Sequence, residues 1–266
     1  MTTGNSMMQL EQGVGWSRGL RNLLRVEFAD WFDSSRWWTQ ILIWTAVIDG
    51  LVLVAALTTP EAEKAEASLM AINLFFALIV PIAVIVMMMG AVVEEKQTGT
   101  AAWVLSKPAS RQSFILAKLI ANTVGVVVTM VAVQALLAYL IMTFVGGAAL
   151  SPLGFLAGLG VHIVNLFFYV ALTTMLGTLF DRRGPVIGIP IAFAFMHQYL
   201  AGLGPFVANF LPWTLVAPPL ITETTSIAPA LMTGTRPESL VPIVAVLGES
   251  IVFIVVALWA FSREEL

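Results

Sequence analysis

Long runs of apolar residues, separated by short polar segments, dominate the hydrophobic pattern of this chain. A transmembrane helix needs about 20 consecutive residues that are mostly apolar, and six runs satisfy this requirement. We expect spans near Trp38–Leu57, Ser68–Val93, Phe114–Val145, Phe155–Phe180, Gly184–Leu203 and Val241–Phe261. Five or seven spans are the alternatives, if one segment is misassigned.

Residues 16–37 precede the first span and have the pattern of an amphipathic helix. Leu20, Leu24, Phe28 and Trp31 recur at helical spacing, and charged residues fill much of the opposite face. Such a helix suits the membrane interface; the alternative is a soluble helix packed on another protein. We accordingly divide the chain into an N-terminal arm, residues 1–37, and a six-span domain, residues 38–266.

A second segment outside the spans joins the last two of them. It is rich in proline, and its apolar run Phe206–Val216 is too short to cross a membrane. Because its aromatic side chains would be costly to expose to water, we expect a short helix or re-entrant piece at the outer interface; a surface loop is the alternative. The predicted fold class is an all-α polytopic membrane protein.

Composition supports a membrane protein. The 266 residues are 59% hydrophobic and 11% charged, whereas soluble domains carry roughly 25% charged residues. A net charge of −3 gives no reason to expect a nucleic-acid partner. The absence of cysteine excludes disulfides and thiol chemistry. No removable signal peptide is apparent, so we expect the first span to act as an uncleaved anchor.

Lysine and arginine are distributed unevenly between the two sides of the predicted topology. Eleven of the 13 fall in the N-terminal arm, the second-to-third connection with the foot of span three, the fourth-to-fifth connection and the C-terminus. Only Lys64 and Arg236 fall on the other side. Positive residues favour the cytoplasmic side, so we expect both termini in the cytoplasm, in a plasma membrane of a prokaryotic cell.

The segment Glu94–Leu119, directly after span two, contains the most informative local pattern. Residues 98–100 (Thr-Gly-Thr) can form a turn and cap a short helix, Ala101–Ser106. Pro108 ends that helix, and Ser110 or Arg111 opens the helix that leads into span three. A short amphipathic helix between two turns can be bound by a cytoplasmic partner protein. The alternative is an ordinary loop whose positive charges only set topology.

This segment resembles the stretch after the second span in permeases of the type-two (type V fold) ABC exporter class. That class carries an acidic residue, a Gly-Thr turn, a coupling helix ending near Ser-x-Pro, and an arginine before span three. The arm, the six spans and the apolar segment before the last span also fit it. In that class a separate ATPase subunit contacts this segment. The resemblance assigns this contact to eight residues: Glu94, Lys96, Thr98, Gly99, Thr100, Leu105, Pro108 and Arg111.

The resemblance implies a dimer of two such membrane subunits above two cytoplasmic ATPase subunits, which bind ATP and magnesium. We expect no cofactor and no catalysis in this chain, which lacks the G-x-x-x-x-G-K-[ST] phosphate loop. Spans one, two and five would line the dimer interface. The apolar spans favour a lipid-like, peptide or other amphipathic substrate.

Polar residues also occur within the predicted spans. Asp49 and Glu249 lie near the middle of spans one and six, where ionised acids are costly and often functional. With no cation at matching depth, each must be protonated, face water, or meet a polar group such as His162, Asn165 or Gln134. They can serve a substrate path or proton relay, or hydrogen-bond between helices. The histidines have no metal-ligand spacing.

Two other function classes compete with the ABC permease. An ion-gradient-driven secondary transporter would use Asp49 and Glu249 as its coupling acids. A membrane-embedded enzyme or scaffold would be expected to carry an interfacial catalytic cluster, and we find no such motif in the sequence.

Overall fold

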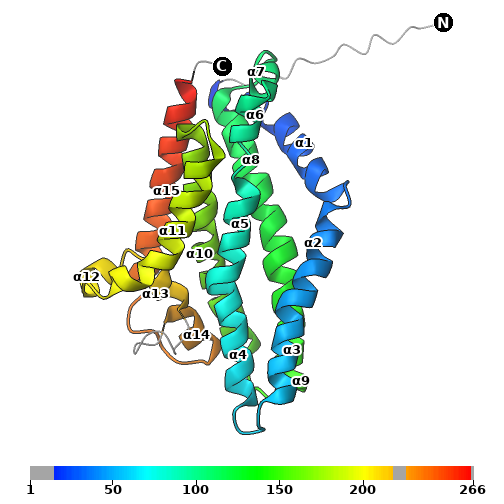
Figure 1. The fold of residues 1–266 in the computed structure, drawn as a ribbon, viewed down its shortest axis with the longest axis vertical. Helices are drawn as coiled ribbons and strands as arrows, with labels where there is room; N and C mark the ends of the chain where they lie inside the picture. The colour runs from blue at the N-terminus through cyan, green and yellow to red at the C-terminus, as the bar shows by residue number, and fades with distance from the viewer. Residues whose placement is uncertain (1–14, 218–225, 265–266) are drawn as a thin grey trace, which may run out of the picture.

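The computed structural model describes residues 15–217 and 226–264, and this part of the chain is helical without a strand (Figure 1). Six of its helices are long and apolar enough to cross a membrane, as expected from the hydrophobic pattern. These six helices indicate a multi-pass membrane protein. These helices run over Arg36–Thr58, Lys64–Gln97, Arg111–Phe144, Pro152–Leu179, Arg183–Ala201 and Val241–Ser262.

Each of the first three spans combines α-helices with a π-helical segment. Their parts are α2 (Arg36–Trp44), η2 (Thr45–Asp49) and α3 (Gly50–Thr58); α4 (Lys64–Leu74), η3 (Phe75–Ile79) and α5 (Val80–Met88); and α8 (Arg111–Val126), η4 (Val127–Ala132) and α9 (Val133–Phe144). The other three are α10 (Pro152–Leu179), α11 (Arg183–Ala201) and α15 (Val241–Ser262).

Within residues 15–217 and 226–264, seven shorter helices lie outside these parts of the spans. Two precede span one, η1 (Gly15–Ser17) and α1 (Leu20–Phe32). Helix α6 (Val93–Gln97) forms the end of span two, and α7 (Thr100–Leu105) lies between spans two and three. The rest are α12 (Pro205–Ala208), α13 (Trp213–Val216) and α14 (Ile227–Met232). We call the end of the bundle that carries α6, α7 and the end of α15 the α7 end (Figure 1).

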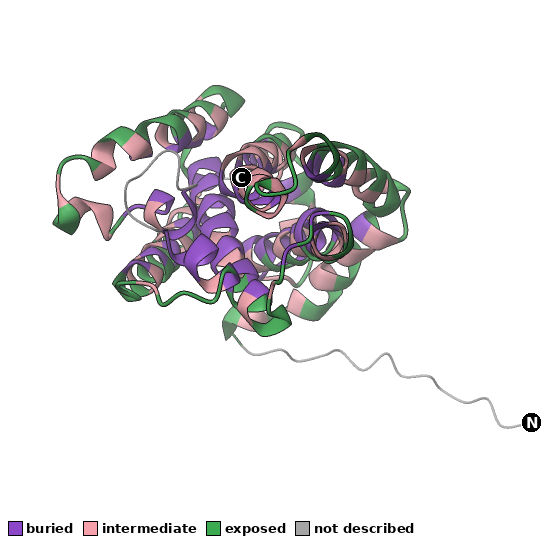
Figure 2. Cartoon of the chain, turned by 90° about the horizontal axis from the view of Figure 1, so that it is seen from below, coloured by how far each residue is buried: buried purple, intermediate pink, exposed green. Residues whose placement is uncertain are grey.

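Helix α10 is the central helix of the bundle. Two thirds of its span are buried, whereas α11, α15 and span one are each 22% buried. One apolar cluster joins spans one to three and α1 to one side of α10, and a second joins spans two, five and six, α13 and α14 to the other. Figure 2 shows this buried interior with the exposed residues on the outer faces.

Helix α1 packs on α8 through a tryptophan and a glycine. Trp31 is 1% exposed, and its indole Nε1 donates to Asn122 Oδ1 at 3.1 Å. The indole lies against Gly125, where a Cβ atom would overlap the ring. The arm predicted over residues 16–37 is thus an α-helix over Leu20–Phe32. Its apolar face, which we expected at the membrane interface, partly packs on the protein itself.

The segment between α11 and α15, where we expected a short helix or re-entrant piece, contains three short helices within the described residues. In Figure 1, α12, α13 and α14 lie beside the bundle, and the α3–α4 turn projects beyond them. Trp213, Leu215 and Val216 are buried in the protein, whereas Phe206 and Phe210 are exposed. Helix α14, which the pattern did not predict, packs on α10.

We predict that Gly125→Ala loosens α1 from α8, because the new methyl group displaces the buried indole of Trp31. Overpacking of this kind costs about 1–3 kcal/mol, which thermal unfolding of the purified protein in detergent would report as a lower midpoint. Gly160→Ala in α10 is the matched control, because its Cβ would meet open space. An equal midpoint for the two variants would contradict the packing described for Trp31.

Candidate functional site

The turn between α6 and α7 has the geometry expected from its Thr-Gly-Thr sequence. Thr98 Oγ1 donates to the carbonyl of Glu94 at 2.8 Å and closes the end of α6. Gly99 has φ +73°, a left-handed conformation that glycine adopts without steric cost. Helix α7 then begins at Thr100 and ends at Leu105, one residue earlier at each end than predicted.

The connection from α7 to α8 also follows the prediction. Pro108 lies in the connection, and the Ser110 side chain caps α8 by accepting from the Ser113 backbone N–H at 3.0 Å. Arg111 is the first residue of α8. The sequence therefore identified both turns that bound the short helix.

The same connection is tied to the start of the N-terminal arm. The Ser110 backbone N–H donates to the carbonyl of Arg18 at 2.9 Å. Ser113 Oγ donates to the carbonyl of Trp16 at 2.8 Å, and Ser110 Oγ donates to the same carbonyl. The arm and the α7–α8 connection are thus joined by backbone and side-chain hydrogen bonds.

Lys96 joins α6 to two segments that are distant in the sequence. Its side chain is 7% exposed, and its Nζ lies 2.7 Å from Asp181 Oδ1 and 2.8 Å from Glu264 Oε1. Asp181 lies between α10 and α11, and Glu264 follows α15. One nearly buried ammonium group therefore connects span two with the ends of spans four and six.

Further contacts strengthen these connections. Arg111 Nη1 donates to the carbonyl of Ser262 at 3.1 Å and to that of Glu264. Glu94 Oε1 lies 2.8 Å from Arg183 Nη2, at the first residue of α11. Glu94, Lys96 and Arg111, which we assigned to coupling, thus bind neighbouring spans within this chain.

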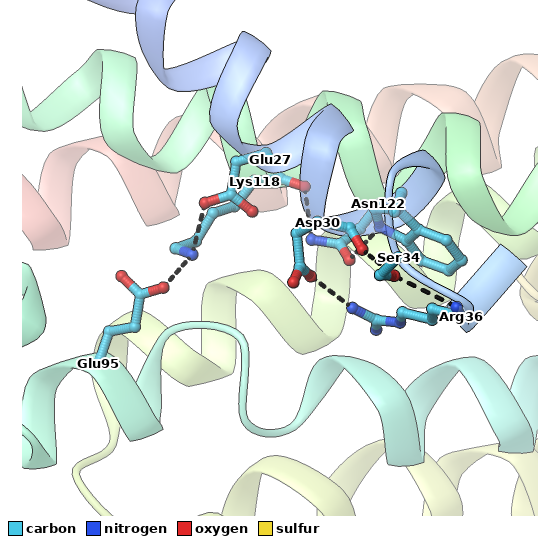
Figure 3. Close-up of polar contacts among 8 residues, drawn as sticks. Glu27, Asp30, Ser34, Arg36, Glu95, Lys118 and Asn122 are labelled. Carbon is cyan, nitrogen blue, oxygen red and sulfur yellow. Dashed lines mark hydrogen bonds and ion pairs between the residues drawn. The ribbon is translucent and has the colours of Figure 1, made fainter.

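Lys118 forms a second buried ion cluster, shown in Figure 3 between α1 and α6. Its Nζ lies 2.8 Å from Glu27 Oε1 and 2.5 Å from Glu95 Oε1, and the side chain is 5% exposed. From the sequence we counted Lys118 only among the positive charges that indicate topology. A lone lysine within the apolar run of span three was the available sign that it needs a partner.

The Lys118 cluster borders a cavity of about 400 Å³ between α1, the end of span two and α8. Glu27, Glu95, Lys118 and Asn122 all face it. The Asn122 side chain accepts from Trp31 and donates to the carbonyl of Lys118. The packing of α1 and the ion cluster are therefore parts of one polar contact region.

Helix α7 has a packed face and an open face. Ala101 is buried, and Val104 and Leu105 pack on a cluster in which Phe114 stacks on Phe261 with 5.3 Å between ring centroids. On the open side Trp103 is 62% exposed, and Lys107 Nζ lies 3.4 Å from the centroid of its ring. Trp103 and Lys107 thus form an exposed aromatic and cationic surface at α7, and the opposite face of this helix packs on the bundle.

Three polar side chains within the spans form hydrogen bonds to a neighbouring span. His162 Nε2 and Asn73 Oδ1 are 2.8 Å apart, and Asn165 Nδ2 donates to the carbonyl of Phe76 at 3.5 Å. Gln134, the amide expected near the acids, accepts from Thr45 at 3.0 Å. These bonds between spans favour the structural interpretation of the interior polar groups.

The two acids within the spans lie in different surroundings. Asp49, the last residue of η2, is 3% exposed, and neither of its carboxyl oxygens has a hydrogen-bond partner in the described structure. Glu249 faces an open groove beside α15. Span one and α15 lie on opposite sides of the molecule (Figure 1), so no single site contains both acids. Within the described residues, no group of three or more His, Asp or Glu could hold a metal ion.

Comparison with known proteins gives one family match. The family described as "Protein of unknown function (DUF2705)" matches residues 53–266, from span one to the end of the chain. No curated protein matches the sequence.

We predict that Lys118→Met is strongly destabilising, because Glu27 and Glu95 then face each other without a cation. Breaking a buried ion pair from one side costs about 3–5 kcal/mol, whereas replacing every partner with neutral groups is often tolerated. Adding Glu27→Gln and Glu95→Gln should therefore recover much of the thermal unfolding midpoint.

Lys64→Met is the control for the removal of a lysine. Its ion pair with Glu61 lies at the opposite end of the bundle, where Glu61 is 89% exposed, and exposed pairs contribute about 0–1 kcal/mol. Equal effects of the two single substitutions, or no recovery in the triple variant, would refute the buried cluster as a stabilising contact.

Proposed function

The chain belongs to the DUF2705 family, and we propose that it is the membrane-spanning permease subunit of an ABC transporter. In this proposal it is an exporter subunit in a prokaryotic plasma membrane, with the α7 end in the cytoplasm. Two copies, or two homologous chains, pair in the membrane above two ATPase subunits. ATP and magnesium bind to those subunits, and this chain performs no hydrolysis.

The geometry of α7 carries the proposal. A coupling helix needs an exposed surface that a partner protein can bind. It also needs a rigid attachment to the transmembrane helices. Trp103 and Lys107 provide the surface, and Ala101 and Leu105 provide the attachment. Tryptophan is among the residues most enriched at the centres of protein interfaces.

The ion pairs of Lys96 and Lys118 would transmit a displacement of α7 to the transmembrane helices. Lys96 connects α6 to the ends of α10 and α15, and Lys118 connects α6 and α8 to α1. A push on α7 would thus act on spans two, three, four and six together, which is what coupling to a motor protein requires. An ordinary topology loop would need none of these contacts.

The outer surfaces of span one and α11 support the proposed pairing of two membrane subunits. Span one and α11 are only 22% buried within the chain, so their apolar faces are available to lipid or to a second subunit. The competing function, an ion-driven transporter with paired acids, is less favoured because the helices that carry Asp49 and Glu249, span one and α15, lie on opposite sides of the molecule (Figure 1).

We predict that Trp103→Ala prevents stable association with the ATPase. Tagged chain purified from its own host in mild detergent should contain a second protein with a G-x-x-x-x-G-K-[ST] loop, and the complex should hydrolyse ATP. Loss of an interface tryptophan costs about 2 kcal/mol or more, so the variant should retain less than about a tenth of the partner.

Trp259→Ala is the matched control, because Trp259 is also exposed at 55% and also lies beside a cation, Arg263. It should keep the full amount of ATPase. If no ATPase is recovered with the unaltered chain, or if both variants lose it equally, the proposed coupling role of α7 is wrong.

The cysteine-free sequence allows a direct test of orientation. We predict that Ser106→Cys, in the connection after α7, resists an impermeant maleimide in intact cells and reacts after the cells are opened. Ala62→Cys, in the exposed α3–α4 turn, should react in intact cells. The reverse pattern would place α7 outside and exclude a cytoplasmic ATPase as its partner.

A further inference from the structure

Glu249 stands in a groove that is otherwise apolar. The groove has a volume of about 430 Å³ and lies between α10, α11, α12 and α15. This volume falls within the roughly 300–1,000 Å³ of small-molecule pockets. Glu249 is the one ionisable side chain among the described residues that line it.

Five of the ten described residues that line the groove are phenylalanines. Phe168 on α10 packs against Phe193 and Phe253, with 5.7 and 5.3 Å between ring centroids. Phe253 follows Glu249 by four residues and so lies on the same face of α15. Phe206 and Phe210 of the α12 segment, whose centroids are 5.3 Å apart, also line the groove.

No cation of the described chain reaches Glu249, which has neither an ion pair nor a hydrogen bond in the structure. The arginines and lysines of the described spans lie near the helix ends, apart from Lys118, which is already paired with Glu27 and Glu95. A second copy seated on this groove would therefore lack a free cation at this depth. A carboxylate placed so deep in a transmembrane helix is costly without one.

A single carboxylate surrounded by aromatic rings selects one chemical class of partner. A calcium or magnesium ion takes about six to eight oxygen ligands, water included, whereas the groove surrounds its one carboxyl group with apolar side chains. A bulky organic cation gains from both features, since ring faces attract cations and quaternary ammonium groups bind in aromatic cages.

We propose that this groove binds a lipophilic organic cation of the quaternary ammonium or phosphonium type, with Glu249 as its counter-ion. The phenylalanine rings contact the apolar substituents, and the carboxylate neutralises the charge. Binding at this groove stands on its geometry alone. The interpretation of this cation as the class of transported substrate rests on the proposed permease function.

The test uses the full chain in lipid nanodiscs, with radiolabelled tetraphenylphosphonium as the probe. We expect saturable binding that Glu249→Gln weakens by at least about tenfold, equivalent to about 1.4 kcal/mol. Asp49→Asn, which alters a closed intramembrane acid, should leave the affinity unchanged. Tetraphenylborate, an anion of nearly the same shape, should not compete.

A second measurement on the unaltered chain remains informative if Glu249→Gln fails to fold. Dicyclohexylcarbodiimide modifies carboxyl groups in apolar surroundings, and mass spectrometry locates the product. Tetraphenylphosphonium should slow modification of Glu249 at least about tenfold, while tetraphenylborate should not.

Equal binding of the two probes would overturn the proposal, as would unchanged affinity in Glu249→Gln or unprotected modification. A crosslink from this groove to a second copy, or a retained lipid that the probe cannot displace, would also overturn it. None of these assays involves the ATPase, so recovery of an ATPase with the chain, as described above, tests the permease function separately.

Discussion

The exclusion of water from a lipid bilayer is the constraint on which the rest of this structure depends. Backbone polar groups in lipid must bond within their own segment, so the spans are helices. Charged side chains are costly there, so most of them gather at the helix ends. At the α7 end they form ion pairs that join helices far apart in the sequence, through Lys96 and Lys118. The same constraint that produces the spans therefore also produces the contacts that fasten their ends together.

The two faces of α7 have different roles in the proposed coupling: one packs on the bundle, and the other is exposed to a partner. The packed face reaches Phe114 and Phe261, whose stacked rings join α8 to α15. The open face presents Trp103, held by the cation of Lys107. Behind α7, the arm is connected through Ser110 and through the Lys118 cluster. A partner that contacts one short helix would thereby act on most of the bundle, which is the physical basis of the proposed permease function.

The polar groups in the membrane interior fall into two kinds. His162, Asn165 and Gln134 bind partners on neighbouring spans and so hold helices together. Asp49 is enclosed, and its carboxyl oxygens have no hydrogen-bond partner among the described residues. Glu249 differs from all of these because it opens onto a groove with five aromatic rings. Exposure to a shaped apolar space, rather than burial, makes Glu249 the candidate for ligand binding.

The sequence by itself determined the six spans, the turns at Gly99 and Ser110, and the short helix between them, because apolar run length and turn chemistry are local properties. It also located the helix of the arm. Only the tertiary structure decided that Trp31 packs against Gly125 and that Lys118 lies between Glu27 and Glu95. It also decided that span one and α15, which carry Asp49 and Glu249, lie on opposite sides of the molecule (Figure 1). These features join residues that are distant along the chain, and hydrophobic periodicity records which face of a helix is apolar but not which neighbour covers it.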